Sequence, residues 1–151
     1  MVSKGVGRFE NSYMLRRIKR GLWLYVPDAG LPLTFVRPSG ERIEITEVVL
    51  TTDLGSTPRI AWWIPGLAPN DIERPAIVHD AIYERHHAGI PGYGFAEANL
   101  ILAEACRAEG YSRLMSWFVR RMCDWFGRPI WNAGGRAAYE MKMEALAARG
   151  A

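Results

Sequence analysis

The stretch AIVHDAIYERHH, residues 76–87, decides how the second half of this 151-residue chain folds. It holds all three histidines of the chain, in a segment that is otherwise apolar up to Tyr83. On a helix, His79 and Tyr83 are four residues apart and share one face, while Asp80 lies about 100° around the axis from His79. Because apolar residues flank them, we expect His79 and Asp80 to be at least partly buried. A buried imidazole or carboxylate needs hydrogen-bond partners, which the rest of the chain must supply.

Asn99 is the first candidate partner. It heads an apolar face of a second predicted helix, on which the following residues are Leu102, Ala103 and Cys106. A polar residue at the head of such a face should point inward to a polar partner. Three further candidates precede the first helix: Asp53, Ser56 and Arg59. Arg59 can pair with Asp80. Ser56 can hydrogen-bond the His79 ring.

The first fifty residues are typical of β structure. GLWLYVPD (21–28) is a short aromatic and β-branched run that ends at Pro27. LTFVRPSGERIEITEVVL (33–50) predicts a hairpin, with strands at 34–37 and 42–46 joined by a turn at 38–40. Residues 51–72 are rich in glycine and proline, and we expect them to form an ordered connecting loop.

The remaining residues, 73–148, are predicted to be mainly helical. Pro75 fits the first turn of a helix, where a proline is tolerated, and Gly110 suits the end of one. The expected helices span 73–87, 96–109, 112–127 and 136–148, with breaks at 88–95 and 127–135. Strands followed by helices predict a single α+β domain over residues 1–151, in which about four helices follow an N-terminal antiparallel hairpin or small sheet.

Composition excludes several classes of protein. A hydrophobic content of 49% and a charged content of 23% are ordinary for a soluble globular domain. No apolar run approaches the roughly 20 residues of a transmembrane helix, and the N-terminus lacks the apolar core of a signal peptide. The net charge of +3 gives no strong nucleic-acid signal. Cys106 and Cys123 match no zinc spacing and are expected to be buried thiols. A basic cluster at residues 16–20 is either a solvated edge or a contact for phosphate or acidic lipid.

Aromatic and basic residues alternate in SRLMSWFVRRMCDWFGRPIW (112–131). One apolar stripe follows helical spacing: Leu114, Phe118, Met122 and Trp125. We expect this stripe to pack on the sheet with the arginines outside. An interfacial membrane helix and a protein–protein contact are the alternatives. Trp62 and Trp63 are either core residues or a docking patch beside the site.

The H-D-x-x-Y pattern at 79–83 resembles the helix motif of secreted phospholipases A2. That resemblance implies that His79 activates a water, that Asp80 binds Ca²⁺, and that Tyr83 bonds an acid on an antiparallel helix, where this chain has Asn99. The His-Asp doublet also resembles that of HD phosphohydrolases. That family needs a metal-binding histidine upstream, and His79 is the first histidine of this chain.

A longer resemblance covers roughly residues 51–131. Its blocks are TDLGSTPR (52–59), then Trp63 and Pro65, AIVHDAIY (76–83) and EAN (97–99), followed by Gly110, Arg120, Phe126-Gly127 and Trp131. In this order they resemble a phage-associated family, domain of unknown function 1353, whose third block reads E-A-D. The resemblance implies a phage or prophage gene and a protein in the bacterial cytoplasm or in a virion. Asn99 in place of the acid weakens the expectation of catalysis but still permits a hydrogen-bonded network.

Two hypotheses follow. In the first, the chain is a metal-assisted hydrolase that uses a divalent metal such as Ca²⁺, with His79 as base or ligand and Asp80 as ligand. Tyr83 and Asn99 orient these groups, and Asp53 is a second ligand or orienter. The residues expected to bind substrate are Ser56, Arg59, Trp62 and Trp63. In the second, the protein is a non-catalytic virion-assembly or host-interaction protein that binds phage or host proteins, and the His-Asp-Tyr cluster is structural. Peripheral membrane contact is left open.

Overall fold

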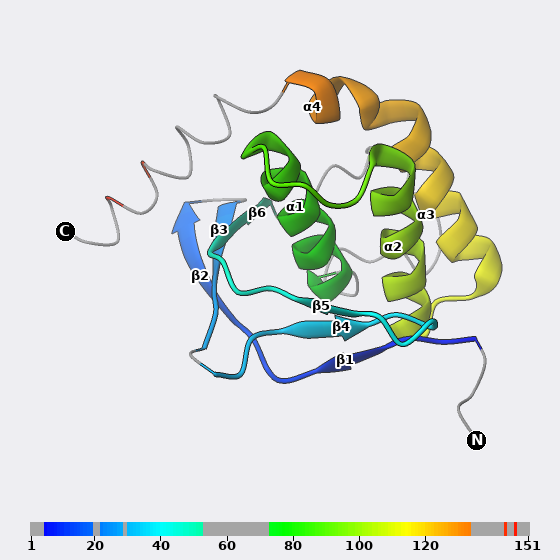
Figure 1. The fold of residues 1–151 in the computed structure, drawn as a ribbon, viewed down its shortest axis with the longest axis horizontal. Helices are drawn as coiled ribbons and strands as arrows, with labels where there is room; N and C mark the ends of the chain where they lie inside the picture. Colours follow the sequence, from blue (N-terminus) through cyan, green and yellow to red (C-terminus); the bar gives the residue numbers. More distant parts are fainter. Residues whose placement is uncertain are drawn as a thin grey trace.

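The part of the chain that the structure describes combines two small antiparallel sheets with four helices (Figure 1). The computed structural model describes residues 5–19, 22–28, 30–52 and 73–133, together with 144 and 147. All strands precede all helices in the described part of the chain. The predicted α+β class is therefore confirmed. None of the described helices is long and apolar enough to cross a membrane.

Each sheet has three strands. The first has the order β1 (Arg8–Glu10), β4 (Thr34–Val36), β5 (Arg42–Glu44), and the second has the order β2 (Met14–Lys19), β3 (Leu22–Val26), β6 (Val49–Thr52). The predicted hairpin is confirmed as β4–β5, which pairs Phe35 with Ile43. Its turn is closed by Gly40 N–H, which donates to the Arg37 carbonyl at 2.8 Å, and the φ of +92° at position 40 favours glycine. The sequence prediction missed β1, β2 and β6.

A buried tyrosine joins the two sheets. Tyr25 of β3 is 1% exposed, and its hydroxyl accepts from Leu33 N–H and donates to the Ile45 carbonyl, both at 2.9 Å. Leu33 precedes β4 and Ile45 follows β5. One hydroxyl thus bonds the backbone on both sides of the hairpin, which fixes the second sheet against the first.

The helices are α1 (Glu73–His87), α2 (Phe95–Ala108), α3 (Arg113–Phe126) and α4 (Arg128–Ala133). The bounds predicted for the first three are confirmed to within a residue. Ser112 caps α3 as expected, since its Oγ accepts from Met115 N–H at 3.1 Å. In Figure 1, α1 lies above the first sheet, with α2 between it and α3. The main core joins both sheets to α1 and α2, through residues such as Phe35, Val49, Ile77 and Ile101.

The break predicted at 127–135 is wrong, because α4 begins at Arg128. Gly127 has ordinary right-handed helical angles, φ −84° and ψ −19°, so the chain continues as helix instead of turning away. Trp131 N–H donates to the Gly127 carbonyl at 2.9 Å. Pro129 stands in the first turn, where a missing N–H is tolerated. The helix predicted at 136–148 lies outside the described residues.

The predicted packing of the α3 stripe on the sheet is also wrong. Leu114 is 71% exposed and Trp125 is 64% exposed. The helix instead packs against α2, and the buried Val119 and Cys123 share a second core cluster with residues of that helix. At about 100° per residue, the apolar residues of α3 other than Trp117 cover about half of its circumference. Periodicity alone did not identify which part of this wide face is buried.

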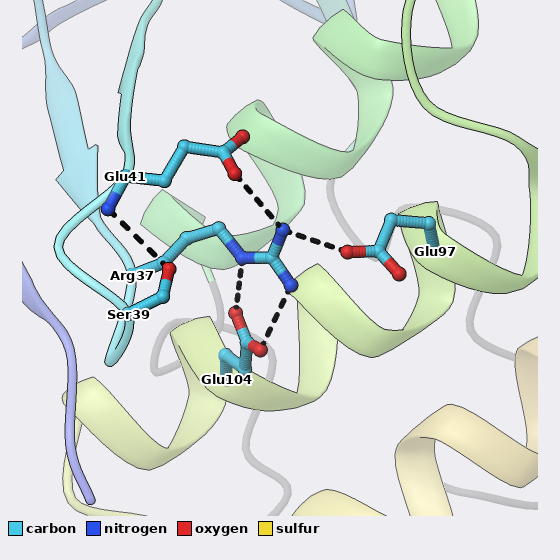
Figure 2. Close-up of polar contacts among 5 residues, drawn as sticks. All are labelled: Arg37, Ser39, Glu41, Glu97 and Glu104. Carbon is cyan, nitrogen blue, oxygen red and sulfur yellow. Dashed lines mark hydrogen bonds and ion pairs between the residues drawn. The ribbon is translucent and has the colours of Figure 1, made fainter. Parts of the chain in front are cut away.

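A buried arginine ties the hairpin to α2 (Figure 2). Arg37 is 9% exposed and its guanidinium meets three carboxylates. Its Nε donates to Glu104 Oε2 at 2.7 Å, and Nη1 lies 2.7 Å from Glu97 Oε1 and 3.6 Å from Glu41 Oε2. The hydrogen bond to Glu104 is the main cause that raises the pKa of Arg37 above its usual range. Glu97, the first residue of the E-A-N block, is thus part of this ion-pair cluster.

Candidate functional site

His79 lies in the middle of α1 and is 4% exposed. The helix is covered on most sides, since Ile77, Val78 and Ala81 are fully buried. The predicted burial of His79 is therefore confirmed. Asp80, on the next position around the helix, is half-buried.

A hydrogen-bonded chain leads from His79 through α2 to α3. His79 Nε2 lies 3.0 Å from Asn99 Oδ1, and Asn99 Nδ2 donates to Asp124 Oδ1 at 2.8 Å. Arg121 Nη1 is 3.4 Å from the other oxygen of Asp124. Asn99 is fully buried, while the Asp124 side chain is 21% exposed. One polar connection therefore links three helices, and we call the residues His79, Asn99 and Asp124 the relay.

The relay fixes the tautomer of His79. Asn99 directs its amide N–H₂ to a carboxylate, which can only accept, so its carbonyl oxygen faces the imidazole. The hydrogen between His79 and Asn99 must then be carried by His79 Nε2. In the neutral ring, Nδ1 consequently holds the lone pair and is the atom able to take up a proton.

Burial controls the charge of His79. Removal of the imidazolium from water lowers the pKa of His79 to about 4, and the bond to Asn99 opposes this effect without overcoming it. The ring is therefore neutral at pH 7. The same bond that opposes the shift also holds Nε2–H in place.

Tyr83 contacts His79 through its ring. The two ring centroids are 4.5 Å apart, and Trp131 of α4 meets Tyr83 edge-on at 5.0 Å. The Tyr83 hydroxyl is buried and has no hydrogen-bond partner among the described residues. Burial raises its pKa well above the usual range, so the phenol stays protonated. A Cβ at position 127 would lie 2.8 Å from this hydroxyl. Because Gly127 has no Cβ, Tyr83 and the start of α4 can lie close together.

Not every predicted site residue can be placed. The structure brings together His79, Tyr83 and Asn99, with Asp80 close enough for its charge to raise the pKa of Tyr83. Within the described ranges, no group of three or more His, Cys, Asp or Glu side chains is arranged to hold a metal ion. The predicted residues that lie outside the described part of the chain are Asp53, Ser56, Arg59, Trp62 and Trp63.

Asp124 is the residue that sequence reasoning missed. It is the single acidic residue in the stretch 112–131, among aromatic, apolar and basic side chains. A lone carboxylate in such surroundings needs a partner, and this signal was available in the sequence. The identity of that partner, Asn99, could not be predicted, because it depends on how α3 packs against α2.

Comparison with known families identifies the chain. The model of the family described as "Protein of unknown function (DUF1353)" matches residues 31–122, more than half of the chain, which therefore belongs to this family. The match covers the hairpin, α1, α2 and most of α3, and so includes His79 and Asn99. Neither a curated protein nor a solved structure shows a significant match to the chain.

Proposed function

We propose that this member of the family is a phage- or prophage-encoded hydrolase in which His79 Nδ1 is the general base. The observation that carries the proposal is the relay, in which Asn99 Oδ1 lies 3.0 Å from His79 Nε2 and Asp124 lies behind Asn99. A histidine base needs its second nitrogen held by a fixed partner, so that the first is presented in one tautomer. The relay meets that requirement on rigid helices.

The electrostatics of the relay suit proton uptake at Nδ1. When Nδ1 takes a proton from a water molecule, the positive charge that develops on the ring lies next to the Asn99 carbonyl oxygen. The negative charge of Asp124 lies one residue further along and polarises that amide. This support is weaker than a carboxylate in direct contact, which agrees with the low pKa of about 4.

Asp80 is the residue that we propose as a ligand for a metal ion. Ca²⁺ prefers carboxylate and carbonyl oxygens and would polarise an ester carbonyl beside the attacking water. The half-buried Asp80, adjacent to His79, would be one ligand of such an ion, and Asp53 would be a second. The resemblance of 79–83 to the phospholipase A2 motif supports a lipid ester as the substrate.

Hydrolysis of phospholipid vesicles tests the proposal. Vesicles of phosphatidylcholine and phosphatidylglycerol are incubated with the protein in Ca²⁺ or in chelator, and released fatty acid is measured. We expect release that depends on Ca²⁺ and falls at least about 100-fold in His79→Gln, the effect of losing a general base. His86→Gln is the matched control, because His86 is exposed on the same helix. Equal release by wild type and His79→Gln, or none from any phospholipid, would contradict the proposal.

The exposed large apolar side chains of α3 and α4 favour a second candidate, a non-catalytic virion-assembly or host-interaction protein. The most exposed of these residues are Leu114, Trp125 and Phe126, at 71%, 64% and 55%. Large aromatic side chains on a surface are typical anchors of protein interfaces. In this case the relay is a structural clamp. His79→Ala would then lower the unfolding midpoint without any loss of catalysis, and metal ions would leave the midpoint unchanged.

A further inference from the structure

A groove separate from the relay runs between α2 and α3. Its volume is about 330 Å³. Each helix lines it with four residues, of which the last three lie three, four and seven positions after the first: Leu100, Ala103, Glu104 and Arg107 on α2, and Arg113, Ser116, Trp117 and Arg120 on α3. The turn of the β4–β5 hairpin contributes Pro38. The volume lies at the lower end of sites that bind small molecules, roughly 300–1,000 Å³. None of the relay residues lines the groove.

Two buried donors in this groove lack partners. Ser116 is 3% exposed, and its Oγ has no hydrogen-bond partner among the described residues. The Nε of Arg120, one helical turn further along α3, is buried and likewise unbonded within the described chain. Buried polar atoms without partners are rare, because each has lost its hydrogen bonds to water. A ligand with acceptor oxygens would satisfy both.

The groove carries a positive charge. Arg107, Arg113 and Arg120 line it, and none forms an ion pair with a described carboxylate. Glu104 is the acid in the lining, but Figure 2 shows both of its oxygens turned to Arg37, at 2.7 and 3.0 Å. Arg107 donates one N–H to the Tyr111 carbonyl at 2.8 Å, which leaves its charge unneutralised. Three guanidinium groups around one small cavity match a multiply charged anion better than a single carboxylate.

The remaining lining adds an apolar surface. Trp117 is 48% exposed at the groove, and Leu100 and Ala103 also line it. We propose that the groove binds a small phosphomonoester that carries a planar ring, the class to which nucleoside monophosphates belong. The phosphate accepts from Arg120 Nε and Ser116 Oγ and is neutralised by the arginines, and the ring packs on Trp117.

Titration calorimetry with four probes tests the proposal: adenosine 5′-monophosphate, ribose 5-phosphate, adenosine and inorganic phosphate. We expect the monophosphate to bind with a dissociation constant at least about tenfold below that of each other probe, because each fragment lacks part of the contacts. Equal binding of ribose 5-phosphate would overturn the role of the ring. Equal binding of adenosine would overturn the role of the phosphate, and no binding of any probe would overturn the site.

Variants distinguish a binding role from a structural one. Arg120→Gln should raise the dissociation constant of adenosine 5′-monophosphate at least about tenfold, the usual effect of losing a charged hydrogen bond. Arg16→Gln is the matched control, since Arg16 is exposed on β2 and should leave binding unchanged. Ser116→Ala should weaken binding yet keep or raise the unfolding midpoint of the free protein, because it removes an unsatisfied hydroxyl. A lower midpoint with unchanged binding would show that Ser116 is structural and would overturn its assignment.

Discussion

The buried, neutral state of His79 predicts a specific dependence of stability on pH. In the folded protein, burial lowers the pKa of His79 from 6.5 to about 4. As the pH falls through 6.5, the unfolded chain takes up a proton on this residue while the folded protein does not. The unfolded state therefore binds more protons in this window, and the free energy of unfolding falls as the pH is lowered.

The size of the effect follows from the same values. Each pH unit over which one more proton is bound by the unfolded state changes the free energy of unfolding by about 1.4 kcal/mol. Between 6.5 and about 4, His79 thus removes about 3 kcal/mol of stability. This is a large part of the 5–15 kcal/mol typical of a folded domain.

Comparison with His79→Gln isolates this contribution. Glutamine does not titrate, and its amide N–H₂ can still donate to Asn99. All other ionisable groups are present in both proteins, so the difference between the two curves belongs to position 79. Urea unfolding at pH 7, 6, 5 and 4, with linear extrapolation to water, gives both stability curves. We expect the wild type to lose about 3 kcal/mol more than the variant by pH 4. Parallel curves would refute the conclusion that His79 is held neutral by burial.

Three further predictions concern residues around the relay. Asn99→Leu leaves His79 Nε2–H and Asp124 without their partner, so the free energy of unfolding, measured in urea, should fall by about 2–4 kcal/mol. The control Asn132→Leu, on the exposed face of α4, should lower it by at most about 0.5 kcal/mol. Burial raises the pKa of both Cys106 and Cys123 to about 12, so a thiol reagent at pH 8 should label them rapidly only in denaturant, and rapid labelling of the native protein would contradict their burial. Gly127→Ala places a Cβ 2.6 Å from the Cys123 carbonyl oxygen, so the backbone must shift, and the free energy of unfolding in the same assay should fall by about 1–3 kcal/mol. An unchanged unfolding midpoint would show that α4 adjusts freely.

The sequence predicted those elements whose signals are local. Pro75 in a first turn and the apolar run after it define α1, and Ser112 defines the start of α3. β1 was missed because three residues carry too little pattern of their own, and Phe9 becomes part of a strand only by pairing with Phe35. α4 was missed because glycine and proline usually mark a break, and at Gly127 the deciding factor is its close contact with Tyr83.

The candidate site also has one part that the sequence predicts and one part that depends on tertiary packing. The pairing of His79 with Asn99 was predictable, since both residues stand on apolar helix faces and each needs a buried partner. The choice of Asp124 as the next partner was not predictable, because the face that α3 turns toward α2 is set by tertiary packing. The groove was hidden for a similar reason. Its arginines are scattered along two helices and meet only when these helices are packed together.

Asn99 explains how one acid and one histidine can share a buried connection. An amide accepts on one side and donates on the other, so it bonds His79 and Asp124 at once. An acid at this position would face Asp124 across about 3 Å, where two carboxylates cannot both ionise. The folded protein would then have to bind one more proton, either on the acid pair or on His79.

Asn99→Asp should therefore reverse the pH dependence of stability. In the wild type, the unfolded state binds the extra proton between pH 6.5 and about 4, so stability rises with pH. In the variant, the folded state binds the extra proton near pH 7, and the free energy of unfolding should fall by up to about 1.4 kcal/mol for each pH unit gained between 6 and 8. The outcome is the same whichever group carries the proton, which makes the sign a direct test of the relay. A variant whose stability rises with pH, as the wild type's does, would mean that Asp124 and position 99 are not in contact in solution.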